Sequence, residues 1–235
     1  MQIKAIKTRV FEDNEDLFAF IVEHIKNIPD KSVLVVTSKI VALGEGRIAE
    51  YNTKKQKDIL IKKESRFALK TKIVWLTIKD GMLLANAGID ESNVKGRKGK
   101  VILLPKDSFE SAMVLRKKLI RHFNLKNLGI VITDSRLMPL RAGAIGVALG
   151  YSGFKGIRNY IGAKDIFGRV MKISQTDVAD SLATSAVLCM GEGKERQPIA
   201  LITDAPVVFS TKLNRQELFI SIKRDIYAPL FNKFN

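Results

Sequence analysis

Three short segments of the sequence combine carboxylate, hydroxyl and glycine residues in patterns that could hold a metal ion or a phosphate group. The segments are residues 86–93, 133–135 and 190–195. Asp90 lies in the first segment and Glu192 in the third. The second contains Asp134 followed directly by Ser135. Carboxylate and hydroxyl oxygens are preferred ligands of hard divalent cations. The three segments therefore predict metal chemistry of the Mg²⁺ or Mn²⁺ type.

The third segment also contains two glycines and is a candidate phosphate-binding loop. Gly191 and Gly193 would let backbone N–H groups approach a phosphate closely. These segments have an ordinary structural interpretation as well. In that interpretation Asp90 and Asn93 cap a turn and Asp134 caps a strand end. Gly191 would then only terminate a helix. Composition and spacing leave both interpretations open.

Other common site chemistries lack the residues that they need. His24 and His122 each fall within a helical pattern, and no Cys or His has metal-ligand spacing, which argues against zinc. The single cysteine, Cys189, is expected to pack inertly among apolar helix residues. The sequence contains no GxxxxGK[ST] loop, GxGxxG turn or GxSxG elbow.

Short apolar strands and amphipathic helices are expected to position the candidate residues. Strands are predicted at residues 33–37, 101–104, 129–133 and 199–203, with a hairpin of 73–78 and 82–84 around Asp80-Gly81. Helices are predicted at residues 14–27, 54–72, 108–123, 179–190 and 216–223. Asp177 is the expected cap of the fourth helix. Strands and helices interleave without regular βαβ spacing, so the predicted class is mixed α/β or α+β.

Charge and composition restrict the functional classes further. The chain has 40 Lys and Arg against 24 Asp and Glu, a net charge of +16. Such a charge attracts polyanions, including nucleotides and nucleic acid. Because no nucleic-acid-binding fingerprint is present, compositional bias and solubility are the preferred explanation over a dedicated nucleic-acid surface. No apolar run approaches the roughly 20 residues of a membrane span. With one cysteine and no signal-peptide pattern at the N-terminus, the expected location is the cytoplasm.

The acidic segments belong to a longer series of matches that resembles the coenzyme F(420)-0:γ-glutamyl ligase family. The matches lie at residues 35–36, 45–47, 64–65, 86–93, 103–105, 107, 111–112, 134–135, 141–143, 146–150, 162–169, 179–180 and 190–193. They follow the family's order from about residue 14 to residue 202. The blocks at 86–93 and 165–169 are the most specific. The resemblance implies mixed sheets with flanking helices, in one catalytic unit spanning residues 1–235.

The resemblance also implies a function. Members are GTP-dependent ligases that join L-glutamate to the lactyl carboxylate of the deazaflavin F(420)-0. A carboxylate is a poor electrophile, so it would first be phosphorylated, and the glutamate amine would attack the resulting acyl phosphate. Two divalent ions, Mn²⁺ or Mg²⁺, would offset the charge of carboxylate and triphosphate. The family resemblance further implies an intertwined homodimer.

Site residues are carried over by position. Asp90 and Asp134 resemble the ligands of one metal and are the catalytic candidates. Ser135, at a threonine position of the family, and Glu192 resemble ligands of the second metal. The implied nucleotide contacts are Ser38, Lys39, Asn93, Met190, Gly191 and Gly193.

Several positions depart from the family pattern. Residues 7–11 lack the Gly-x-Pro-x-Ile segment, and 42–43 replace a Ser-Lys pair, which removes a lysine expected near the nucleotide. Arg9 and Lys39 are the candidate replacements. Residues 137–138 stand where the family has Gly-Arg, and Ser181 stands for a glutamate. These changes, with the basic charge, are the basis of an alternative function, a diverged non-ligase relative that binds an anionic ligand or nucleic acid; the ligase function remains the favoured prediction.

Overall fold

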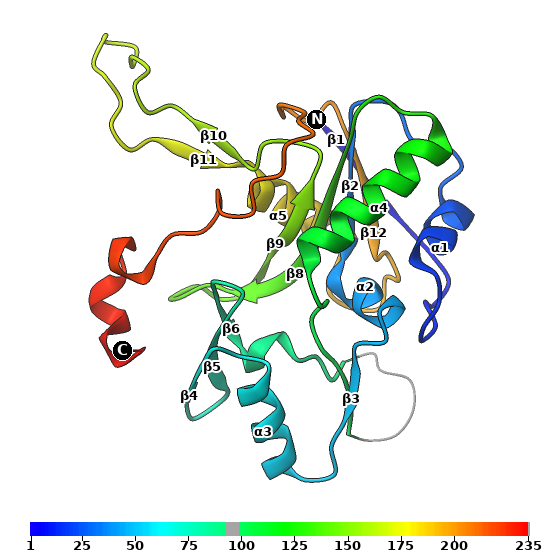
Figure 1. Ribbon diagram of the computed structural model, residues 1–235, viewed down its shortest axis with the longest axis vertical. Coiled ribbons are helices and arrows are strands. Elements are labelled where there is room, and N and C mark those ends of the chain that lie inside the picture. The colour runs from blue at the N-terminus through cyan, green and yellow to red at the C-terminus, as the bar shows by residue number, and fades with distance from the viewer. Residues whose placement is uncertain (93–98, 235) are drawn as a thin grey trace.

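The computed structural model describes residues 1–92 and 99–234 and is built on a mixed five-stranded sheet (Figure 1). In spatial order the strands are β1 (Gln2–Ile6), β12 (Ile199–Thr203), β2 (Ser32–Thr37), β8 (Leu128–Leu137) and β9 (Ala144–Ser152). Strands β2 and β8 run parallel, and every other neighbouring pair is antiparallel. The sheet therefore has one parallel junction, between its third and fourth strands.

Helices cover both faces of this sheet. One face packs against α1 (Leu17–His24), α2 (Ser38–Gly44) and α4 (Ser108–Phe123), and the other against α5 (Val178–Met190). Strand β2 shows why both faces need cover, since Leu34 and Val36 enter the first core while Val33 and Val35 enter the second. Successive strand side chains point to opposite faces, so an unbroken apolar run is buried on both sides.

Two smaller sheets lie at one end of the main sheet (Figure 1). One pairs β3 (Ile48–Glu50) with β7 (Lys100–Ile102), and the other contains β4 (Phe67–Lys70), β5 (Trp75–Lys79) and β6 (Met82–Ala85) beside α3 (Lys54–Lys63). Glu64 joins these parts because its Oε2 accepts from Arg47 Nη2 at 2.8 Å and from Lys79 Nζ at 2.9 Å. The two cations lower the pKa of Glu64 although burial acts in the opposite direction.

Two further segments extend from the main sheet. An arm formed by β10 (Ile157–Asn159) and β11 (Gln175–Asp177) projects away from the body (Figure 1). After β12 the chain is mostly irregular, with short 3₁₀ helices η2 (Ile222–Arg224) and η3 (Ala228–Phe234). Glu217 holds this C-terminal segment against the sheet, since its Oε1 accepts hydrogen bonds from Tyr151 Oη and, at 2.6 Å, from Gly156 N.

Most predicted elements and the mixed fold class are confirmed. Helix α4 has the predicted bounds, and α5 is capped by Asp177, whose side chain accepts from Asp180 N. The hairpin of β5 and β6 turns at Asp80 and Gly81, both with positive φ. Within the described residues, no helix has the length and apolar character needed to cross a membrane.

Predictions for two helices and for Cys189 are wrong. The helix predicted over 54–72 ends at Lys63, because residues 67–70 pair with β5 as a strand. No α-helix forms at 216–223, where the Glu217 contacts anchor an irregular segment. Cys189 is exposed, since the buried face of α5 contains Leu182, Ala186 and Met190 instead.

The α5 cap generates a testable prediction about pH. Burial and the nearby Asp180 carboxylate raise the pKa of Asp177 well above its ordinary value. A raised folded-state pKa contributes stability at low pH that is lost as the pH rises through that pKa. Asn caps a helix equally well without a charge. We therefore expect Asp177→Asn to be about 1–2 kcal/mol more stable than the wild type at about pH 8 and nearly equal at about pH 4, by urea unfolding. The same difference at both pH values would contradict the assignment.

Candidate functional site

Asp134 and Ser135 lie inside a strand and not at its end. Strand β8 continues to Leu137, past a register shift with β9 between Ile132 and Thr133, so the predicted end at Thr133 is wrong. Pairing with β9 sustains the strand beyond the apolar run. Residues alternate between the two faces, so Asp134 and Ser135 point to opposite sides of the sheet. Asp134 and Ser135 therefore belong to two separate clusters of candidate residues.

The first cluster forms where β2 ends beside β8. Thr37 is the last residue of β2 and pairs with Thr133, and Ser38 begins α2. Ser38 Oγ donates to Asp134 Oδ1 at 2.9 Å. Burial raises the pKa of Asp134 to about 6, although this hydrogen bond acts to lower it. The negative charge of Asp90 also contributes to raising the pKa of Asp134. A nearby cation would stabilise the ionised form of a carboxyl group in this position.

Asp90 reaches this cluster through a tight backbone turn. The 3₁₀ helix η1 (Asn86–Gly88) has Asn86 and Ala87 at positive φ, and Ala87 N donates to Thr77 Oγ1 at 2.9 Å. A Cβ atom on Gly88 would lie 2.7 Å from the Leu104 side chain, so only glycine fits there. Asp90 then forms a two-bond bridge with Ile102. The small residues of the predicted segment are thus needed to place its carboxylate.

Lys39 supplies a positive charge to the first cluster. Its Nζ lies 2.7 Å from Asp90 Oδ2 and 3.1 Å from Ser92 Oγ. Burial acts to raise the pKa of Asp90, but Lys39 and the Ser92 N–H group, which donates to Oδ1 at 2.6 Å, hold it below its ordinary value. The other candidate cation, Arg9, makes ion pairs with Glu15 and Glu23 instead. Of the two, Lys39 is the one in contact with a predicted site residue.

The second cluster lies on the opposite side of β8. Ser135 Oγ donates to Glu192 Oε1 at 2.5 Å. Glu192 follows the end of α5, where Met190 is buried and Gly191 has a φ of 79°. In the same loop Gly193 N donates to Glu195 Oε2 at 2.8 Å. A backbone N–H group of the predicted phosphate loop therefore already binds an anionic oxygen of the protein.

The structure thus brings together most of the predicted residues, in two groups. One contains Ser38, Lys39, Asp90 and Asp134, and the other contains Ser135, Glu192 and the 190–193 loop. Asn93 lies outside the described residues. No cluster of three or more His, Cys, Asp or Glu suited to a metal is found in the described part of the chain. The donors of the first group are nonetheless hard oxygens of two carboxylates and one hydroxyl, the set that Mg²⁺ and Mn²⁺ prefer.

Sequence reasoning missed two residues beside these groups. Ser92 contacts Lys39, and Arg136 follows Asp134 on the same side of β8. The charges of Arg136 and Asp134 are close enough to influence each other. Arg136 could have been found only by extending the predicted strand past Thr133, because alternation then places residues 134 and 136 on one face.

The family assignment agrees with this geometry. The sequence model of the F(420)-0:γ-glutamyl ligase family matches residues 5–204, which include all predicted site residues. The chain belongs to this family.

Similar proteins within the family come from archaea. The chain is 31% identical to the coenzyme F(420):L-glutamate ligase of Methanococcus maripaludis over 97% of both chains. It is 30% identical to the ligase of that name from Archaeoglobus fulgidus over 92% of both. A match to the one from Methanocaldococcus jannaschii is 41% identical over 58% of this chain and 53% of that protein. The family likeness therefore extends over nearly the whole chain.

Proposed function

We propose that this protein is a γ-glutamyl ligase that joins L-glutamate to the carboxylate of F(420)-0 in an amide bond. The observation that supports this most strongly is the first cluster, where the half-buried Asp134 carboxylate lies beside Asp90 and Ser38, with Lys39 paired to Asp90. The family match and the printed names of the relatives point to the same reaction. A related carboxylate acceptor would fit the same reaction class.

The reaction requires activation of a carboxylate. In the proposed sequence a carboxylate oxygen of the acceptor attacks the γ-phosphorus of GTP, and GDP leaves. The glutamate amine then attacks the carbonyl carbon of the acyl phosphate, phosphate leaves and the nitrogen loses a proton. Lys39 would balance negative charge as the anionic substrates approach. The N–H group of Gly193 would bind a phosphate oxygen after Glu195 moves aside. The N–H group of Gly191 donates to Val187 O at 2.9 Å, so Gly191 would contribute by letting the phosphate approach the backbone closely.

Two divalent ions complete the proposal. Asp90 and Asp134 would hold one, and Ser135 and Glu192 the other. When bound, Mn²⁺ or Mg²⁺ would neutralise phosphate charge and polarise the transferred group. The first pair fits this role because two carboxylates near each other, one with a raised pKa, favour a neighbouring cation. The second pair provides a hydroxyl and a carboxylate within hydrogen-bond distance.

The central test is ligation itself. We expect purified protein with GTP, Mn²⁺, L-glutamate and F(420)-0 to produce a glutamyl adduct detected by mass spectrometry. Asp134→Asn should reduce the rate by at least about 100-fold, since it removes a carboxylate from the charge-stabilising cluster. Asp80→Asn is a matched control, because Asp80 occupies a left-handed hairpin position that Asn also favours. An active Asp134→Asn variant would refute the site assignment.

Nucleotide and metal use have a separate measurement. Calorimetric titration should show GTP binding that requires Mn²⁺, is abolished by a chelator and is lost in Asp134→Asn. A parallel titration with ATP shows whether the protein prefers a guanine or an adenine nucleotide. Binding of neither nucleotide would mean that the altered residues at 7–11 and 42–43 have removed the energy-coupling step, and would favour the non-ligase alternative.

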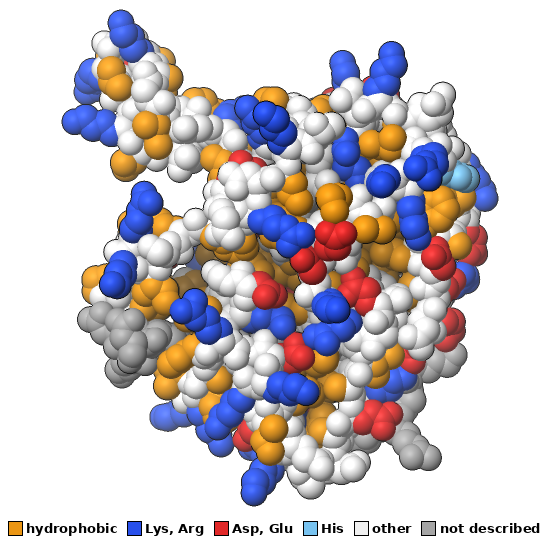
Figure 2. Space-filling model, viewed as in Figure 1, with side chains coloured by type: hydrophobic (Ala, Val, Ile, Leu, Met, Phe, Trp, Pro, Cys, Tyr) orange, Lys and Arg blue, Asp and Glu red, His pale blue; other side chains and the backbone are white. Residues whose placement is uncertain are grey.

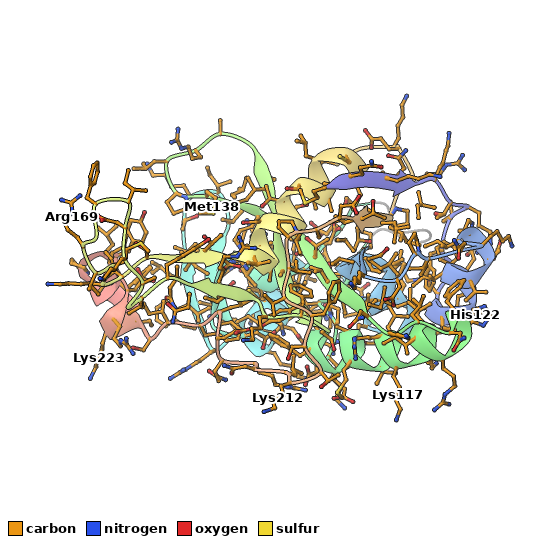
Figure 3. All side chains as sticks on the ribbon, turned by 90° about the horizontal axis from the view of Figure 1, so that it is seen from above. Lys117, His122, Met138, Arg169, Lys212 and Lys223 are labelled. Carbon is orange, nitrogen blue, oxygen red and sulfur yellow. The ribbon has the colours of Figure 1, made fainter. Side chains whose placement is uncertain are left out.

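A homodimer is proposed on the basis of the β10–β11 arm. Its distal part exposes Ile166, Phe167 and Ile173, which are 92%, 76% and 87% exposed. Figure 3 shows Arg169 at the end of this arm, at the opposite end of the molecule from His122 of α4. Exposed apolar groups on a projecting element are typical of protein interfaces. A second copy of the chain is the proposed partner.

Sedimentation measurements can test whether the β10–β11 arm forms the dimer interface. We expect the wild type to sediment as a dimer and Phe167→Asp to shift the population toward monomer, because burying an unpaired carboxylate in an apolar interface is unfavourable. Ile73→Asp serves as the control, since Ile73 is 93% exposed and lies away from the arm. Equal dimerisation of all three proteins would contradict a role for the arm.

The nucleic-acid alternative remains a prediction based on charge. Figure 2 shows Lys and Arg side chains spread over the visible face and not gathered in a single stripe. A dedicated nucleic-acid surface normally concentrates basic residues along one track. The face seen in Figure 2 therefore gives no support to the nucleic-acid alternative.

A further inference from the structure

A small cavity lies along β9, the edge strand of the main sheet. It has a volume of about 220 Å³ and is bounded by the β5–β6 hairpin, the first turn of α5 and the C-terminal segment. Phe219 and Ile222 form part of its apolar wall. Drug-sized ligands usually occupy pockets of roughly 300–1,000 Å³, so this cavity suits a smaller molecule, such as one amino acid. The C-terminal wall lies beyond the residues matched by the family's sequence model.

Arg136 contributes an incompletely paired guanidinium group to this cavity. Its Nε is buried and has no hydrogen-bond partner among the described residues. Its Nη2 lies 3.0 Å from Met82 Sδ, a weak acceptor. A buried guanidinium usually has a carboxylate partner, because leaving it unpaired is costly.

Acidic groups line the same cavity. Asp177 and Asp180 belong to the N-terminal end of α5, where Asp177 Oδ1 accepts from Asp180 N and Asp180 Oδ1 accepts from Ala148 N. Both line the cavity together with Arg136, and Asp225 of the C-terminal segment is a third carboxylate in its wall. The two hydrogen bonds fix the carboxylates of Asp177 and Asp180 in place. A fixed guanidinium and fixed carboxylates in one small space are complementary to a molecule with both an anionic and a cationic group.

The cavity is also adjacent to the first cluster. Arg136 is two residues beyond Asp134 on the same side of β8, a separation of roughly 7 Å along a strand. A ligand bound by Arg136 would therefore lie next to the carboxylates proposed to support acyl activation. Nucleophile and activated carboxylate would then meet without movement of the main sheet.

We propose that this cavity is the binding site for the amino-acid substrate, with Arg136 binding a carboxylate of L-glutamate and Asp177 and Asp180 binding its ammonium group. This inference rests on the proposed ligase function and assigns residues to its amino-acid half. Arg136 is then a substrate-binding residue, and the C-terminal segment closes the site.

Steady-state kinetics test the proposal. Arg136→Gln should raise the KM for L-glutamate by about 10- to 100-fold, as expected for loss of a charge-assisted pair, and should leave the KM values for GTP and F(420)-0 within about threefold. Arg136→Lys, which keeps the charge, should show a smaller rise. Arg121→Gln on the exposed last turn of α4 is the matched control and should behave as the wild type. Circular dichroism and melting curves establish that each variant folds.

Inhibitors identify the contacted carboxylate. L-glutamine lacks the side-chain carboxylate and 4-aminobutyrate lacks the α-carboxylate. The analogue that retains the bound group should inhibit the wild type competitively against L-glutamate and should lose this inhibition in Arg136→Gln. If neither analogue inhibits, or if inhibition is equal in wild type and variant, the proposal is overturned. An equal rise of all three KM values would also overturn it, since that would indicate a structural role.

Failure of the proposed function can be distinguished from failure of this inference. If the wild type ligates and Arg136→Gln has an unchanged KM for L-glutamate, only the cavity assignment is wrong. If the wild type does not ligate, calorimetric titration with L-glutamate decides the matter directly. Binding that is lost in Arg136→Gln would support the cavity without the ligase reaction, and absence of binding would reject both.

Discussion

The parallel pairing of β2 with β8 is the constraint on which the site depends. Parallel strands present their carboxyl ends at the same edge of a sheet, where the chain leaving one strand meets its neighbour. Strand β2 stops at Thr37, but β8 continues to Leu137 because β9 still pairs with it. Asp134 is therefore placed beside the first turn of α2, where Ser38 donates to it. Burial of the carboxyl group in this position raises its pKa.

Strand alternation then divides the chemistry between two sides of β8. Asp134 and Arg136 share one half-buried side, while Ser135 is exposed on the other with Glu192. The half-buried side is next to a small, partly open cavity, whereas the exposed side adjoins a glycine-containing loop. One strand thus carries two separate groups of polar residues, one on each side of the sheet.

The sequence predicted the elements whose signals are local. Asp107 and the apolar spacing after it define α4, and Asp80-Gly81 defines the hairpin. Residues 67–70 were misassigned because a basic, weakly patterned segment becomes a strand only when β5 is present to pair with it. The C-terminal segment is held by Glu217, a contact with Tyr151 and Gly156 more than sixty residues earlier. Site residues matched the family by type and spacing, but their division into two clusters depends on the register of β8 with β9.

Local pairing, and not the total of +16, determines which cations can act on a substrate. Arg9 is occupied by Glu15 and Glu23, and Arg116 donates from Nε to Leu128 O at 2.7 Å. Such groups stabilise the fold, and their charge is already balanced or their donors are already used. Lys39 and Arg136 differ, because each lies beside a carboxylate of the first cluster. The partners of Lys39 are Asp90 and Ser92, which belong to the site itself, whereas Arg136 has an Nε without a hydrogen-bond partner among the described residues. The open guanidinium donor beside the acidic cluster is therefore a local feature, which the charge of the remaining surface does not determine.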